Sequence, residues 1–492
     1  MNSVECNDNH SRTSCRRTSG NRREFLGQVS ASVALLVGVP TVLDSVMRDA
    51  QASDEGGWYL ADFMLDVTIP IGHRCMGVLP TKSKSVADAL ELHGFVLFGD
   101  GKPVVVVALD WCEIRNGSYD RWRERLARAA KTDPDHVLLS CLHQHDAPVI
   151  DEDAQRYLDQ VGLRGELFDP VFHEEVLVRT EQAVVEAIGD AAWDPKRRVT
   201  DVGFGQVAVR DVASNRRIVQ ADGKVTFARG SSSGRDPLFR DADEGLIDPM
   251  LRTVSFWNGD RCLLEYHTYA THPMSYYGRG EVTSDFVGLA RKQRQRETRG
   301  THQMYASGCS GDVTAGKYND GTPEARVALT EKIREAMQRS ATAVSKSGSK
   351  SFRLRSVPLE LPYTREPGLQ KDALLGVLKD TSATTENRIL AAMGLASIDR
   401  AVEKRRPIDL VCLDLDSVRL VLFPGESFVG YQGLAQRHSG GIPVLPIGYG
   451  ECWTGYVPTE SAFADGFHES WLWVDRGAEA AIDEALQKLL SD

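Results

Sequence analysis

Hydrophobic residues in the first part of the chain gather into short runs that predict strands. Residues 63–68 form one such run. Residues 90–109 contain GFVLF and PVVVVAL on either side of Asp100-Gly101, which predicts a hairpin. The PVVVVAL run does not alternate, so this strand should be buried on both faces. An amphipathic helix over residues 119–130 and a buried strand over residues 136–140 then predict a βαβ unit.

The rest of the chain mixes helical and strand-like patterns, with no internal repeat in the sequence. Helical periodicity covers residues 172–188, 285–299, 323–344, 372–405 and 478–490. Hairpins are expected around Asp222-Gly223, around Asn258-Gly259 and over residues 409–423. A long loop is expected over residues 231–244, and a Ser/Gly/Lys linker over residues 345–351. Mixed strands and helices throughout predict an α/β or α+β protein.

Composition narrows the class of protein without naming it. The 492 residues are 42% hydrophobic and 26% charged, as in a soluble globular protein. A formal net charge of -11 argues against a nucleic-acid partner, since phosphate binding requires clustered Lys and Arg. The length suits one large domain or two moderate ones.

The N-terminal segment has the pattern of an export signal. Arg22-Arg23 precedes a modest apolar stretch over residues 29–39, and Ala50-Gln51-Ala52 offers a small-x-small cleavage site. The stretch is too short to span a bilayer as a helix. We therefore predict a twin-arginine signal over residues 1–52, export to the periplasm or beyond, and a mature domain over residues 53–492. The alternative is an ordinary N-terminal helix with a basic start.

Cysteines give no sign of a disulfide framework or a cysteine zinc site. No CxxC pair occurs. Cleavage after Ala52 would leave seven cysteines, an odd number, so at least one thiol would be unpaired within a single chain. Buried free thiols that pack as small hydrophobes are the default interpretation, and the sequence leaves the disulfide state open.

Residues 140–148, SCLHQHDAP, give the strongest indication of chemistry. His143 and His145 follow a predicted buried strand, at the edge of an α/β sheet where ligands gather. Two residues apart on a strand, they would point to the same face and could chelate a metal, or one could bind it while the other moves protons. A pair of solvated histidines at a strand end is the alternative.

Four further segments carry residues suited to a site, and each also has a structural explanation. His272 follows an apparent strand and precedes a proline. The loop over residues 308–319 holds Ser310 and Thr314 among small residues that let a ligand approach the backbone. Glu426 follows an apolar strand and a Pro-Gly turn. The last segment is the aromatic turn over residues 453–459.

Taken together, residues 62–469 resemble the catalytic domain of the neutral, non-lysosomal ceramidase family. The resemblance covers this domain and not the family's C-terminal immunoglobulin-like domain. It is carried by short motifs whose order and spacing agree with the family: Leu65-Asp66-Val67-Thr68-Ile69-Pro70, His143-Gln144-His145, Asn215-Arg216, Thr271-His272-Pro273, Gly311-Asp312-Val313-Thr314, Pro424-Gly425-Glu426 and Gly455-Tyr456-Val457.

The resemblance implies one Zn²⁺ and an amide-cleaving reaction on a ceramide-like or other N-acyl substrate, with possible contact at a membrane surface. The zinc ligands that it implies are His143, His272, Glu426 and Tyr456. It implies a proton-transfer or supporting role for His145 and a polar contact near the scissile group for Arg216.

Two departures from the family pattern leave the substrate open. Thr314 stands where the family has a serine; it keeps a hydroxyl, on a side chain that is stiffer at χ1, and the resemblance implies a catalytic role in orienting the zinc-bound water or the scissile carbonyl. Asp146-Ala147 replaces Ser-Gly after the histidines. Hydrolysis of another bond, such as an ester, and an exported binding protein without catalysis therefore stay open as alternatives.

The export signal generates a first prediction. Changing Arg22-Arg23 to Lys-Lys keeps the charge but removes the recognised pair, so the protein should stay in the cytoplasm of a bacterial host that has the twin-arginine route. Cell fractionation measures this. Unchanged export would contradict the assignment of this segment.

Overall fold

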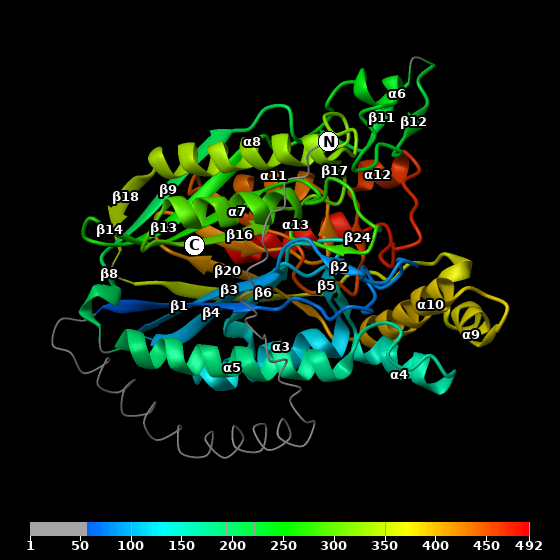
Figure 1. Ribbon diagram of the computed structural model, residues 1–492, viewed down its shortest axis with the longest axis horizontal. Helices are drawn as coiled ribbons and strands as arrows, with labels where there is room; N and C mark the ends of the chain where they lie inside the picture. Colours follow the sequence, from blue (N-terminus) through cyan, green and yellow to red (C-terminus); the bar gives the residue numbers. More distant parts are fainter. Residues whose placement is uncertain (1–56, 100, 193, 221, 350, 492) are drawn as a thin grey trace, which may run out of the picture. The chain divides into compact units, whose positions relative to one another are not determined.

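Two five-stranded sheets form the centre of the computed structural model (Figure 1). The structure describes residues 57–99, 101–192, 194–220, 222–349 and 351–491. The predicted signal over residues 1–52 lies outside the described residues.

The first sheet has the strand order β6-β4-β3-β1-β8. Its strands are β1 (Trp58–Asp66), β3 (Glu91–Gly99), β4 (Gly101–Leu109), β6 (Val137–Cys141) and β8 (Arg198–Val199). The predicted hairpin is confirmed, since β3 and β4 pair antiparallel with Leu92 opposite Leu109. The predicted βαβ unit is also confirmed: α3 (Asn116–Ala130) connects β4 to β6, which run parallel. β4 is buried from Pro103 to Leu109, as its unbroken apolar run predicts.

The second sheet has the strand order β16-β14-β13-β9-β18. Its strands are β9 (Asp201–Ala208), β13 (Met250–Asn258), β14 (Arg261–Tyr269), β16 (His302–Ser307) and β18 (Ser345–Gly348). The predicted linker at residues 345–351 is wrong in part, because β18 pairs antiparallel with β9. The side chains of β18 are all exposed. An edge strand needs only backbone partners, so its polar sequence resembles that of a loop.

The two sheets are built by the same succession of elements. Each has three antiparallel strands, then a helix, then a strand parallel to the third, and each closes with a strand that pairs with the first. Thus β1, β3, β4, β6 and β8 correspond to β9, β13, β14, β16 and β18. The sequence shows no repeat, but the topology does.

The core lies between the sheets, and helices cover their outer faces (Figure 1). Phe95 of β3 packs against Phe256 of β13 and Tyr266 of β14, with ring centroids 5.3 and 6.1 Å apart. Helices α3 and α5 (Pro170–Ala192) contact the first sheet, while α7 (Asp285–Glu297) and α8 (Pro323–Thr342) contact the second. The result is an α/β/β/α arrangement, which confirms the predicted mixed α/β class.

A third sheet, of order β19-β20-β21-β23, follows in the chain. Its strands are β19 (Arg353–Leu359), β20 (Ile408–Asp414), β21 (Arg419–Leu422) and β23 (Val444–Ile447), with α11 (Gly430–His438) and α13 (Ala478–Leu490) packed beside them. The hairpin predicted over residues 409–423 is confirmed. Residues 372–405 are mostly helical, as predicted, but they form two helices, since α9 (Lys371–Lys379) ends before α10 (Thr385–Ile398). Thr384 caps α10 by accepting a bond from the backbone of Asn387.

Short strand pairs and helices complete the domain. The pairs are β2 (Ser85–Val86) with β15 (Glu281–Val282), β5 (Glu113–Ile114) with β7 (Val149–Ile150), β10 (Ser214–Asn215) with β17 (Val313–Thr314), β11 (Ile218–Val219) with β12 (Val225–Thr226), and β22 (Glu426–Ser427) with β24 (Tyr456–Val457). The helices are α4 (Glu152–Gln160), α6 (Pro237–Arg240) within the predicted long loop, and α12 (Glu460–Ala464).

Two general features of the described residues bear on function. Their seven cysteines are all free thiols, which settles the disulfide state that the sequence left open. None of the helices in the described part of the chain has the length and apolar character that crossing a bilayer would require.

The packing of α8 on β9 generates a second prediction. A Cβ added at Gly205 would lie 2.2 Å from the Ser340 carbonyl oxygen of α8. Gly205→Ala should therefore lower the free energy of unfolding by about 1–3 kcal/mol, as overpacking does. Gly189→Ala, in open space on α5, is the matched control and should raise it by about 0.5–1 kcal/mol. Urea unfolding measures both, and equal stability of the two variants would contradict this account of the packing.

Candidate functional site

The two predicted histidines of the SCLHQHDAP segment lie together just beyond a strand end. β6 ends at Cys141, so His143 and His145 lie beyond the strand, in a turn where His143 has φ 66°. The turn, and not strand alternation as the sequence suggested, brings their Nε2 atoms to 3.3 Å from each other. Both side chains are buried.

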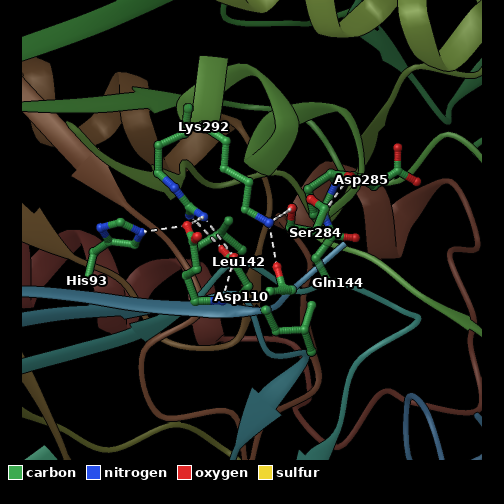
Figure 2. Close-up of polar contacts among 12 residues, drawn as sticks. His93, Asp110, Leu142, Gln144, Ser284, Asp285 and Lys292 are labelled. Carbon is green, nitrogen blue, oxygen red and sulfur yellow. Dashed lines mark hydrogen bonds and ion pairs between the residues drawn. The ribbon is translucent and has the colours of Figure 1, made fainter. Parts of the chain in front are cut away.

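A network of charged and polar side chains connects this turn and the end of the first sheet to α7 (Figure 2). Gln144 donates from Nε2 to the Ser284 carbonyl oxygen at 2.7 Å, next to the first turn of α7. The Ser284 hydroxyl accepts from Lys292 Nζ at 3.0 Å. Asp110, directly after β4, pairs with Arg291 of α7 at 2.7 Å. The end of the first sheet is thereby fixed to a helix of the second.

His272 and Glu426 meet the two histidines from other sheets. His272 follows β14, and its Nδ1 lies 2.7 Å from the Ser310 carbonyl oxygen. A carbonyl only accepts, so Nδ1 carries the proton and Nε2 keeps its lone pair. Glu426 Oε2 lies 3.2 Å from His272 Nε2 and 3.3 Å from His143 Nε2. One carboxylate oxygen therefore faces both imidazoles.

Tyr456 and Arg216 stand beside Glu426. Tyr456 is the register partner of Glu426 in the parallel β22–β24 pair. Arg216 donates from Nη1 to the Tyr456 hydroxyl at 2.8 Å and from Nη2 to Glu469 at 2.8 Å. Arg216 Nε is buried without a hydrogen-bond partner among the described residues.

Burial and mutual charge set the protonation of the cluster. Burial alone would raise the pKa of Glu426, but His143 and His272 outweigh it and lower that pKa. Burial alone would lower the pKa of His143, yet the Glu426 carboxylate raises it. Burial, followed by the charges of the neighbouring histidines, lowers the pKa of His145 well below its ordinary value. Burial also lowers the pKa of His272.

The donor set fits a zinc ion. One ligand atom from each of His143, His145 and His272 lies within 4.8 Å of the others, and so do those of Glu113, His143 and Glu426. Imidazole nitrogen and carboxylate oxygen are ordinary zinc ligands. His145 Nδ1 and Glu113 Oε1 are buried without hydrogen-bond partners among the described residues. Each could therefore bind a partner that these residues do not supply.

Two residues at the cluster were missed by the sequence analysis. Glu113 Oε1 lies 3.6 Å from His143 Nδ1, and its other oxygen accepts from Arg115 at 2.9 Å. Glu113 follows the buried strand β4, so its place at the same sheet edge as His143 could have been found from the pattern. Tyr449 stacks on His143 with centroids 4.5 Å apart and bonds the Ser310 hydroxyl at 2.8 Å. No local pattern around Tyr449 signals this contact.

Thr314 makes its hydrogen bonds away from the histidines. Its hydroxyl donates to the Gly230 carbonyl oxygen at 3.2 Å and accepts from the Gly316 backbone N–H at 3.1 Å. These bonds connect β17 to the loop that begins at Gly230. Its suggested part in catalysis stays a prediction.

Two solved structures share this architecture. A structure titled "Ceramidase complexed with C2" superposes with a TM-score of 0.61 at 16% identity, over 89% of this chain and 75% of the other. The neutral ceramidase from Pseudomonas aeruginosa gives a TM-score of 0.60 at 17% identity, over 89% and 74%. This chain has the neutral ceramidase fold. The resemblance drawn from the sequence motifs is thus confirmed at the level of the fold, although no protein-family model and no curated protein matches the sequence.

The bonds of Thr314 generate a third prediction. Thr314→Val removes the hydroxyl and leaves the buried Gly316 N–H unpaired, while the Gly230 carbonyl keeps its bond from Ser233, so the free energy of unfolding should fall by about 1–3 kcal/mol. Thr314→Ser keeps the hydroxyl and is the matched control, with a smaller loss for the missing methyl. Chemical denaturation measures both. Equal stability of the valine variant and the unmodified protein would remove this role from Thr314.

Proposed function

We propose that this protein is a zinc-dependent hydrolase that cleaves the amide bond of an N-acyl substrate. One observation carries the proposal: three imidazoles and a carboxylate, all buried, converge in a chain with the neutral ceramidase fold. Buried charged groups are costly without a partner, so such a convergence favours a bound cation.

Each residue has a part in this proposal. His143, His272 and Glu426 would hold the zinc, with the Tyr456 hydroxyl beside them. Bound zinc supplies Lewis acidity, which activates water at neutral pH and polarises a carbonyl. His145 has an unpartnered Nδ1 and can carry a proton to the leaving nitrogen. Arg216 orients the Tyr456 hydroxyl and offers its unpartnered Nε–H to a substrate oxygen.

We also propose that the protein works outside the cytoplasm. The support is the Arg22-Arg23 pair and the apolar stretch that follows it. The twin-arginine route carries folded proteins, so zinc could be inserted before export.

Metal content and turnover test the proposal. The purified protein should hold about one zinc per chain. His143→Ala and Glu426→Gln should each lose most of it, because each removes a ligand. His145→Ala should keep the zinc while its kcat on an N-acyl amide falls by about 10²–10⁴-fold, as loss of a general acid–base does. His438→Ala, a histidine that pairs with Asp483 elsewhere, is the control and should change neither.

A matched set of amide and ester substrates completes the test. Hydrolysis of esters alone would replace the amide assignment with an esterase. A folded protein that holds no zinc and hydrolyses neither would leave the binding-protein alternative.

A further inference from the structure

A polar pocket lies beside the histidine cluster. Its volume is about 440 Å³, in the range of small-molecule sites. Three separate segments line it: residues 230–235, residues 276–279 and residues 320–321. The side chains that these segments contribute belong to serines, tyrosines, arginines and one aspartate, with no aliphatic residue among them.

The pocket and the cluster share a wall. Tyr277 lines the pocket, and its ring meets the ring of His145 edge-on with centroids 4.5 Å apart. Gly230, also in the lining, accepts the bond from Thr314. A substrate whose scissile bond lies at His145 can therefore extend a second group past Tyr277 into the pocket.

The pocket lining has an excess of positive charge, because it holds two arginines and one carboxylate. Arg235 donates no hydrogen bond within the described ranges, although its charge, after the hydrogen bonds from Thr322, helps to lower the pKa of Asp320. Arg279 donates one bond, to the Gly321 carbonyl oxygen at 3.3 Å. A guanidinium carries five N–H donors, so most remain available. Asp320, the one carboxylate in the lining, already accepts from the Thr322 backbone and hydroxyl at 3.0 and 2.6 Å.

Contacts behind the pocket hold its walls in place. Tyr276 lies between two guanidinium groups, with Arg279 4.1 Å and Arg326 3.7 Å from its ring centroid. Asn319 donates to the carbonyl oxygens of Ser231, in the first lining segment, and of Ser275, directly before the second, at 2.6 and 2.5 Å. A site built before the ligand arrives loses less free energy to ordering on binding.

We propose that this pocket binds an oxyanion on the substrate, and that the substrate is an N-acyl compound whose amine part carries a carboxylate or a phosphate. The inference rests on the proposed amide hydrolysis for the position of the scissile bond. Guanidinium groups such as those of Arg235 and Arg279 recognise carboxylate and phosphate through charge-assisted bonds. A second hydrocarbon chain would find no aliphatic surface in the pocket, so a neutral two-chain lipid such as ceramide is disfavoured there.

A matched substrate series tests the proposal. N-lauroylglycine carries a carboxylate, N-lauroyl-phosphoethanolamine a phosphate, and N-lauroylglycinamide no charge. One of the two anions should exceed the neutral amide in kcat/KM by about 10-fold or more, and the better anion identifies the group recognised. The double variant Arg235→Gln/Arg279→Gln should abolish this preference with its zinc content unchanged. Arg296→Gln, an exposed arginine of α7 outside the pocket, is the control and should retain it.

Two outcomes would overturn the pocket assignment: equal rates on charged and neutral substrates, or a preference that survives in the double variant. Failure of the proposed function is separable by calorimetry. If the protein hydrolyses none of the three, selective binding of an anion that the double variant loses would still support the pocket. Equal binding of all three compounds would reject it.

Discussion

The carboxylate of Glu426, placed between the imidazoles of His143 and His272, is the interaction on which the rest of the site depends. Removing a carboxylate from water is costly, and here it faces His143 Nε2 at 3.3 Å and the Nε2 lone pair of His272 at 3.2 Å, an arrangement that a shared cation would stabilise. The three residues follow strands of three different sheets. Their convergence therefore fixes how the sheets meet, and the neighbouring Tyr456 and Arg216 take their positions from Glu426 through the β22–β24 pair.

The repeated topology explains why the residues of the site meet at one edge of the two larger sheets. In each of the two larger sheets, the third strand and the strand parallel to it end at the same side. Glu113 and His143 follow β4 and β6, while His272 and Ser310 follow the corresponding β14 and β16. Ligand sites gather outside the carboxyl ends of parallel strands, and here two such ends face each other. The Ser310 carbonyl then selects the tautomer of His272.

Elements with a strong local pattern were predictable from the sequence. The β3–β4 hairpin has a turn dipeptide between β-rich runs, and α13 has clear periodicity. β18 was not predictable, since its pairing with β9 uses backbone alone. The break before α10 depends on capping by Thr384. The residues around it are polar, as on the exposed face of a helix, so the sequence pattern does not reveal the break.

The residues of the site, too, were predictable only where a local sequence pattern marks them. His143, His272 and Glu426 each stand after an apolar strand, and the order of the motifs that carry them indicates a common site from the sequence alone. The stacking of Tyr449 on His143 and the bonds of Thr314 to the loop at Gly230 depend on loops distant in sequence. Periodicity carries no information on how such loops cross. The polar pocket is likewise assembled from three segments that no motif connects.

The separation of the cluster along the chain has a consequence for how the protein folds. Glu426 lies 154 residues from His272. Contacts between residues so far apart in sequence have a large loop-closure entropy cost until the intervening sheets have formed. They therefore slow folding more than local contacts do. We expect the cluster to be among the last parts of the molecule to assemble. In a partly folded chain the histidines would lie apart and could not bind a metal ion together. Metal binding at this cluster would then require that the whole domain had reached its native state.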